Sequence, residues 1–225
     1  MIDKVRPKVA QLLDSDRSGH GMDHVERVCS LAMKFARKEG ADPTVTRLIA
    51  LLHDADDYKL FGMENARDLS NSRRILEECG IPDPIQKQVL SALADIGYSK
   101  RLMGHVPSSI EGMVVSDSDM CDAIGANGIL RVYAYSMKEG RPFFDRGAFP
   151  VEDVSAESYT GRTADSSVDH MFEKLLRLKG LMLTGSGREE AARRDRVVVD
   201  FLYSLFEEED AAEWKAYLDD YLLKR

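Results

Sequence analysis

The stretch 48–57, Leu-Ile-Ala-Leu-Leu-His-Asp-Ala-Asp-Asp, restricts the possible folds of this chain more than any other feature. Its apolar residues favour burial, whereas the histidine and the aspartates at its end need a partner, such as a cation, once they are buried. A metal ion would meet that need if other parts of the chain supplied further ligands. The stretch therefore predicts a buried element that ends at a metal-binding site.

Apolar residues recur at helical spacing along most of the chain. From His24 onward they occupy positions i+4, i+7 and i+11, so the inner face of one predicted helix begins with a histidine. Asp23 stands where an N-cap is expected. Asp42 followed by Pro43 marks the start of the next helix, which we expect to continue to residues 53–54.

Strand-like alternation is absent from the sequence, so the pattern predicts an all-α fold. We expect one globular helical domain over 1–225, with its motif region at about 17–125 and its C-terminal helices at 166–223 completing the core and the pocket. Gly125 and Gly128 predict close packing or a break within a helical stretch at 110–138. The expected helices cover 2–14, 23–40, 42–54, 64–79, 83–97, 110–138, 166–183, 188–208 and 211–223, with loops at 98–109 and 139–165.

Composition narrows the function classes. The formal net charge of −8 argues against a nucleic-acid-binding surface but is compatible with a small anionic substrate bound in a locally positive pocket. The sequence has no apolar run of about 18 residues and no charged-then-apolar leader, which predicts a cytoplasmic protein without a membrane span. The expected partner is a small phosphorylated molecule, and a monomer and a homodimer are both compatible with the sequence.

The candidate metal ligands are His24, His53, Asp54 and one acidic residue from the cluster at 117–122. Each lies on an apolar helix face or near a helix end. Two imidazoles and two carboxylates form a mixed nitrogen and oxygen site, which suits Mn, Fe, Co, Ni or Zn better than Ca. We expect one divalent ion, and its identity, Mg included, stays open.

These residues resemble the H…HD…D signature of the HD-domain superfamily of metal-dependent phosphohydrolases, with His24, His53-Asp54 and Asp119 in the matching positions. The resemblance covers about 17–195 and implies an HD-type helical bundle in which Asp119 is the last metal ligand. The chain lacks the extra histidines that some members carry near 93–98, so we expect a single metal. Gly-His-Gly-Met-Asp-His-Val-Glu-Arg-Val at 19–28 also resembles the opening of that signature. The stretches 111–126 around Asp-Met-Cys-Asp-Ala-Ile-Gly-Ala, Gly-Arg-Pro at 140–142, and 173–179 resemble a bacterial subgroup of HD hydrolases.

The resemblance also suggests catalytic and substrate-binding residues. Asp57 occupies the position of the glutamate in HD nucleotidases that carry H-D-x-x-E, so it is the expected catalytic acceptor that orients water. Asp56 is expected to be a solvated charge. The expected substrate-binding residues are His20, Arg27, Lys59 and Lys174. Two alternatives stay open: Arg27 could instead orient a ligand carboxylate, and Arg177 or Lys179 could face the site in place of Lys174.

The implied activity is metal-dependent hydrolysis of a small phosphorylated metabolite, with nucleoside triphosphate pyrophosphohydrolysis as the leading expectation. The enzymatic alternatives are a nucleoside monophosphate 5′-nucleotidase and a phosphodiesterase acting on signalling nucleotides. The second is less favoured because His53-Asp54 continues Ala-Asp, not the Ile-Gly common in cyclic dinucleotide phosphodiesterases. A non-enzymatic module that binds a nucleotide or a metal is the remaining alternative.

Overall fold

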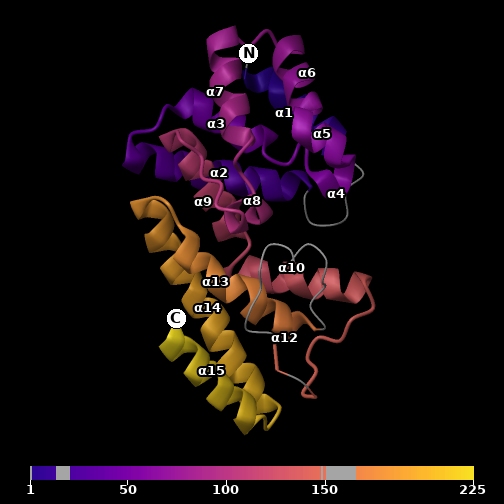
Figure 1. Ribbon diagram of the computed structural model, residues 1–225, viewed down its shortest axis with the longest axis vertical. Helices are drawn as coiled ribbons and strands as arrows, with labels where there is room; N and C mark the ends of the chain where they lie inside the picture. The colour runs from indigo at the N-terminus through magenta and orange to yellow at the C-terminus, as the bar shows by residue number, and fades with distance from the viewer. Residues whose placement is uncertain (1, 14–20, 148, 151–165) are drawn as a thin grey trace. The chain divides into compact units, whose positions relative to one another are not determined.

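The computed structural model describes residues 2–13, 21–147, 149–150 and 166–225, and every regular element in these ranges is helical (Figure 1). The prediction of an all-α fold is confirmed. The chain divides into two compact units: unit 1 consists of Met1–Asp122 and Met182–Glu189, and unit 2 of Ala123–Leu181 and Glu190–Arg225. The prediction that 1–225 forms one domain stays a prediction. No helix in the described part of the chain is long and apolar enough to cross a membrane.

Unit 1 is organised around α3. This helix packs against α1, α2, α7 and α9, and Leu48, Ile49 and Leu52 on it are almost completely buried. The central position of α3 carries the residues that follow it into the interior of the unit. The elements of unit 1 are α1 (Ile2–Leu13), α2 (Met22–Glu39), α3 (Pro43–Leu52), α4 (Tyr58–Phe61), α5 (Met63–Asp68), α6 (Ser70–Glu78), α7 (Asp83–Leu93), α8 (Tyr98–Leu102), α9 (Ile110–Asp122) and the start of α14 (Gly185–Glu208).

Local capping fixes the junction between α2 and α3. Gly40 ends α2 in the left-handed region (φ 73°), where a residue without a side chain is least strained. Asp42 caps α3 by accepting hydrogen bonds from the backbone N–H groups of Thr44 (2.8 Å) and Val45 (2.9 Å). The prediction that Asp23 caps α2 is wrong, because the helix begins at Met22 after Gly21.

Two predicted elements differ from the structure, and a third is broken where a break was expected. The helix expected at 64–79 is divided into α5 and α6 at Leu69, which adopts a left-handed conformation (φ 52°). The loop expected at 98–109 contains the short helix α8. The break expected within 110–138 is confirmed: α9 ends at Asp122 and α10 begins at Gly125, whose φ of 79° explains why glycine stands there.

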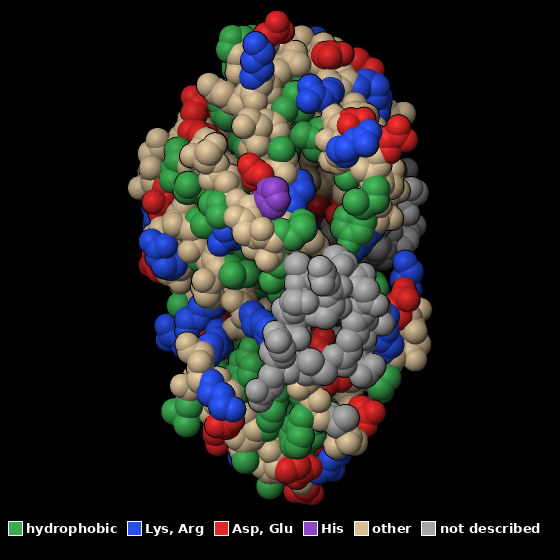
Figure 2. Space-filling model, viewed as in Figure 1, with side chains coloured by type: hydrophobic (Ala, Val, Ile, Leu, Met, Phe, Trp, Pro, Cys, Tyr) green, Lys and Arg blue, Asp and Glu red, His purple; other side chains and the backbone are tan. Residues whose placement is uncertain are grey.

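Unit 2 has an aromatic core. Phe172, Phe206 and Trp214 are buried, and the ring centroid of Trp214 lies 5.6 Å from that of Phe206 and 6.2 Å from that of Phe172. On the face of the molecule shown in Figure 2, basic and acidic side chains are interspersed. The elements of unit 2 are α10 (Gly125–Lys138), α12 (Ser167–His170), the π-helical segment η1 (Met171–Leu175), α13 (Leu176–Leu178), the 3-10 segment η2 (Lys179–Leu181), the rest of α14, and α15 (Ala212–Lys224).

Candidate metal centre

Two histidines from consecutive helices meet inside unit 1. His24 lies in the first turn of α2 and is 1% exposed, and His53 directly follows α3. Their Nε2 atoms are 3.1 Å apart. The Nδ1 of His24 lies 2.7 Å from a carboxylate oxygen of Asp122, and the Nδ1 of His53 lies 2.8 Å from the backbone oxygen of Ala50. When Nδ1 carries the proton in each neutral ring, both Nε2 lone pairs are left for a common ligand.

Two carboxylates complete the cluster around the Nε2 atoms. Oδ2 of Asp54 lies 3.4 Å from Nε2 of His24 and 3.5 Å from Nε2 of His53. Oδ1 of Asp119, which projects from α9, lies 3.4 Å and 3.9 Å from the same two atoms. The structure thus brings together the four residues that the sequence analysis selected as metal ligands.

The spacing of these atoms fits a divalent cation. Nitrogen and oxygen ligands bind such ions at about 2.0–2.2 Å, so that neighbouring ligand atoms around one ion stand about 3.0–3.5 Å apart. Most separations in the cluster fall in this range or within a few tenths of an ångström of it. Among the described residues, His24, His53 and Asp119 can each offer one ligand atom within 4.8 Å of the others. Asp54 is not one of these three, but it lies beside them and could offer a second carboxylate.

The electrostatics of the cluster favour a positive charge. Burial lowers the pKa of His24, but hydrogen bonds to Asp119 and Asp122 and the charge of Asp54 outweigh burial and raise this pKa to about 9. Burial raises the pKa of Asp119, but the hydrogen bond to His24 and the charge of His53 outweigh it, and the net effect is a lowered pKa. An ion held among these groups would replace the proton on His24.

Asp122 lies against the cluster but was not among the residues predicted from the sequence. It is 2% exposed and, besides contacting His24, it accepts hydrogen bonds from Nε (2.8 Å) and Nη2 (3.0 Å) of Arg27. Nη1 of Arg27 donates to Asp23 at 2.9 Å. This geometry favours the alternative that Arg27 orients a carboxylate, and its contact with substrate stays a prediction. Helical spacing could have pointed to Arg27 and Asp122. Arg27 lies three residues, or about one turn, after the candidate ligand His24, and Asp122 lies three residues after the candidate ligand Asp119.

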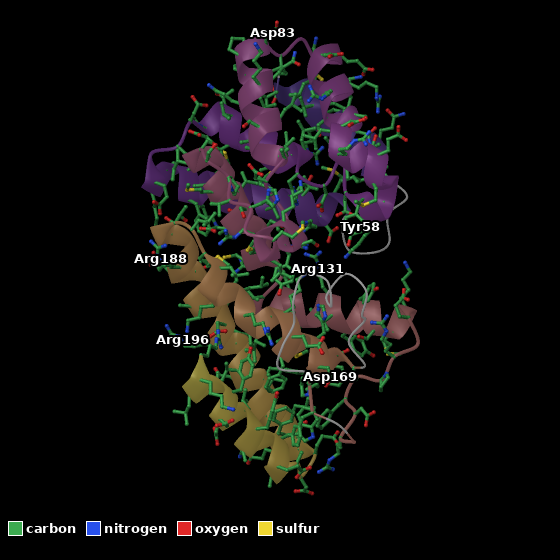
Figure 3. The ribbon with its side chains drawn as sticks, viewed as in Figure 1. Tyr58, Asp83, Arg131, Asp169, Arg188 and Arg196 are labelled. Atoms are coloured by element: carbon green, nitrogen blue, oxygen red, sulfur yellow. The ribbon has the colours of Figure 1, made fainter. Side chains whose placement is uncertain are left out.

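Asp57 reaches the region by a turn and not by a helix. Because α3 ends at Leu52, Asp57 does not lie on a continuation of that helix. Instead, the backbone N–H of Asp57 donates to the backbone oxygen of Asp54 (3.2 Å), and Oδ1 of Asp57 caps α4 by accepting from the N–H of Lys59 (2.8 Å). The side chain of Lys59 is exposed, with Nζ 5.7 Å from the ring centroid of Tyr58, the residue labelled at the start of α4 in Figure 3.

Asp56 is a structural residue, and the prediction that it is solvated is wrong. It is 6% exposed and accepts hydrogen bonds from the backbone N–H groups of Asn71 (2.8 Å) and Ser72 (3.0 Å) and from the side-chain amide of Asn65 (2.8 Å). It therefore caps the first turn of α6 and ties the turn after His53 to that helix.

Asp117 also serves the fold. Its carboxylate accepts hydrogen bonds from the backbone N–H groups of Leu183 (2.9 Å) and Thr184 (2.8 Å) and from the Thr184 hydroxyl (2.7 Å). A Cβ at Gly187 would lie 2.1 Å from Oδ2 of Asp117, so only glycine allows this approach. Asp117 thus anchors the segment that leads into α14.

The structure does not test the remaining predicted residues. His20 lies outside the described residues. Lys174 belongs to η1 of unit 2, whereas the cluster belongs to unit 1. Arg177 and Lys179 were the alternatives to Lys174. Nε of Arg177 donates to the backbone oxygen of Phe172 (3.4 Å), and Nζ of Lys179 lies 3.5 Å from Oδ2 of Asp195. A contact of these cations with the substrate stays a prediction.

Comparison with known proteins agrees with this geometry. The model of the HD domain family matches residues 21–124, a range that contains His24, His53, Asp54 and Asp119. The YpgQ protein of Bacillus subtilis is 31% identical over 205 residues, which cover 90% of this chain and 91% of YpgQ.

Solved structures resemble the chain over nearly its full length. A protein of Lactobacillus plantarum is 32% identical with a TM-score of 0.80, covering 93% of this chain and 97% of its own. An HD-superfamily hydrolase of Bacillus thuringiensis is 31% identical with a TM-score of 0.73 and the same two coverages. The structure of Bacillus subtilis YpgQ in complex with ADP is 28% identical with a TM-score of 0.69, covering 92% of this chain and 94% of YpgQ. This chain therefore belongs to the HD superfamily of metal-dependent phosphohydrolases.

Proposed function

We propose that the protein hydrolyses nucleoside triphosphates to nucleoside monophosphates and pyrophosphate, with one divalent ion held by His24, His53, Asp54 and Asp119. The observation that carries the choice of a nucleotide is the similarity to YpgQ, which has been crystallised in complex with ADP. The expectation of pyrophosphate as the product comes from the sequence resemblance to a bacterial subgroup of HD hydrolases.

The proposed ligands suit phosphate chemistry. The two imidazoles contribute neutral Nε2 donors and the two carboxylates contribute negative charge, so a divalent ion would be nearly neutralised by its protein ligands. When bound, such an ion acts as a Lewis acid that polarises a phosphoryl oxygen and lowers the pKa of water. Asp122 and the backbone oxygen of Ala50 hold the two imidazoles in the orientation that binding requires.

Asp57 is the proposed acceptor for the proton of the attacking water. Its Oδ1 is used by the N–H of Lys59, and Oδ2 accepts no hydrogen bond from any described residue. Water attack at the α-phosphorus forms the new P–O bond and breaks the bond to the bridging oxygen, so that pyrophosphate leaves. Because the turn from Asp54 to Asp57 is closed by a backbone hydrogen bond of 3.2 Å, the acceptor stands close to a proposed metal ligand.

A substrate panel tests the proposal. The purified protein, after determination of its metal content, is incubated with nucleoside tri-, di- and monophosphates and with cyclic nucleotides, each in Mn, Mg, Co or Ni. Release of pyrophosphate and monophosphate from triphosphates supports the proposal. Release of orthophosphate from monophosphates points to the 5′-nucleotidase alternative, opening of cyclic nucleotides to the phosphodiesterase, and binding without turnover to the regulatory module.

The ligand assignment has its own test in the same assay. His53→Ala and Asp54→Ala are expected to remove both bound metal and turnover. His105→Ala is the matched control, because His105 is exposed and pairs with Asp95 on the surface. Full activity in either of the first two variants would contradict the assignment.

A further inference from the structure

Lys100 is a half-buried cation that the proposed mechanism does not yet use. It lies in α8, and its Nζ donates a hydrogen bond to the backbone oxygen of Leu93, the last residue of α7 (3.2 Å). That is the one hydrogen bond of Nζ to a described residue, and no described carboxylate oxygen lies within 4.0 Å of Nζ. An ammonium group carries three N–H donors, so two of them have no acceptor among the described residues.

The charges around Lys100 connect it to the turn that carries the proposed catalytic residue. Burial lowers the pKa of the Lys100 ammonium, and the charges of Asp95, Asp57 and Asp56 raise it without making up for burial, so the pKa remains lowered. The positive charge is thus only partly compensated. An additional anion beside Nζ would supply the missing compensation and accept the two remaining N–H donors.

The other cations of this region are less well suited to a phosphate. The guanidinium of Arg27 is held by Asp122 and Asp23, and the side chain of Lys59 is exposed. Lys100 combines partial burial, unused donors and an electrostatic interaction with Asp57, and a charged hydrogen bond is stronger in a partly buried site than in open water.

We propose that Lys100 is a substrate-binding residue, whose Nζ donates to a non-bridging oxygen of the substrate's phosphate chain beside Asp57. The inference rests on the proposed function in so far as the ligand is a phosphate chain held close to the metal centre. The positive charge of Lys100 is opposite to that of the phosphates. The bond from Nζ to Leu93 fixes the direction of the side chain.

The test measures binding of inorganic pyrophosphate to the metal-loaded full chain by isothermal titration calorimetry. Lys100→Met and Lys100→Gln both remove the charge, and glutamine retains an N–H donor for Leu93. Each is expected to weaken pyrophosphate binding roughly 10- to 100-fold, the range for losing a hydrogen bond to a charged group. Lys100→Arg should stay within about 5-fold of the wild type, because the charge remains. Lys87→Ala, which alters an exposed lysine of α7, is the matched control and should bind as the wild type does.

Metal content and Tm, measured on the same samples, separate binding from folding. Unchanged metal content and Tm with weakened pyrophosphate binding support the proposal. It is overturned if both charge-removing variants bind pyrophosphate as tightly as the wild type, if the wild type does not bind pyrophosphate, or if the loss of binding follows a loss of metal or of Tm. A wild type that binds pyrophosphate through Lys100 but hydrolyses no nucleotide would refute the proposed function and leave this binding site intact.

Discussion

Replacing Asp122 by asparagine tests whether the support behind His24 controls the metal site. The carboxylate is 2% exposed and contacts Nδ1 of His24 (2.7 Å) and Nε and Nη2 of Arg27 (2.8 and 3.0 Å). Asparagine keeps the size of the side chain but removes the charge and one acceptor oxygen. Loss of such an outer partner typically lowers metal affinity by about 10- to 100-fold, and each factor of ten corresponds to about 1.4 kcal/mol. We therefore expect Asp122→Asn to weaken metal binding by roughly 1.4–2.8 kcal/mol.

The assay is calorimetric titration of the metal-stripped protein with Mn²⁺ at one fixed pH. Asp23→Asn is a close control, because Asp23 pairs with the same Arg27 (2.9 Å) but its side chain is 76% exposed. The control should change the Kd by no more than about 3-fold, as expected for an exposed ion pair. Unfolding of the metal-free proteins in urea measures the separate cost to the fold, which we expect to be about 1–3 kcal/mol for Asp122→Asn.

Two results would refute the reasoning. If Asp122→Asn binds Mn²⁺ within 2-fold of the wild type, roughly 0.4 kcal/mol, then the contact with Nδ1 does not hold the imidazole for the metal. If Asp23→Asn weakens binding as much as Asp122→Asn does, the effect comes from the position of Arg27 and not from the direct contact with His24.

Three further predictions concern residues with separate roles. Asp57→Asn should lower kcat by roughly 10²- to 10⁴-fold with metal content unchanged, as measured by steady-state kinetics and metal analysis; a loss of metal in this variant would instead make Asp57 a ligand. Asp56→Ala should destabilise the protein by about 1–2 kcal/mol in urea unfolding, because the cap of α6 is lost. Hydrogen bonds from Arg193 and Arg194 lower the pKa of Glu190 from 4.5 to about 2, so their stabilising effect is complete above pH 4.5 and is lost as the pH falls towards 2. The stability difference between the wild type and Glu190→Gln should accordingly shrink between pH 5.5 and pH 3; a constant difference would contradict the assignment.

Helix ends were predictable where a short-range signal determines them. Gly40 and Asp42 act through their own backbone conformation and side chain, so their neighbours in sequence suffice to identify a stop and a start. The division between α5 and α6 has no such signal. Leu69 is 7% exposed and adopts a left-handed conformation that leucine does not favour, so the surrounding packing imposes it.

The roles of Asp56 and Asp57 likewise could not be predicted from the local sequence. In the sequence, Asp56 and Asp57 are adjacent charges of one type, and nothing local distinguishes them. Their roles differ because Asp56 meets the first backbone N–H groups of α6, whose residues come fifteen positions later, whereas Asp57 caps the helix that follows it directly. The position of a distant helix end decides which of the two is structural, and this cannot be inferred from spacing.

Helical periodicity distinguishes the acidic residues of α9 only in part. An α-helix turns by about 100° per residue, so Asp117 and Asp119 point about 160° apart, whereas Asp119 and Asp122 point only about 60° apart. Asp117 accordingly binds the segment before α14, and the other two both face His24. Helical rotation thus predicts that Asp117 faces away from the other two aspartates, but it does not predict which of Asp119 and Asp122 is the better candidate metal ligand. The two differ in their contacts. Arg27 neutralises Asp122, which lies on the Nδ1 side of the His24 ring, whereas Oδ1 of Asp119 lies beside Nε2 of both histidines. A residue of another helix therefore makes Asp119 the better candidate ligand, and a variant of Asp122 tests whether Asp122 instead supports His24 as proposed.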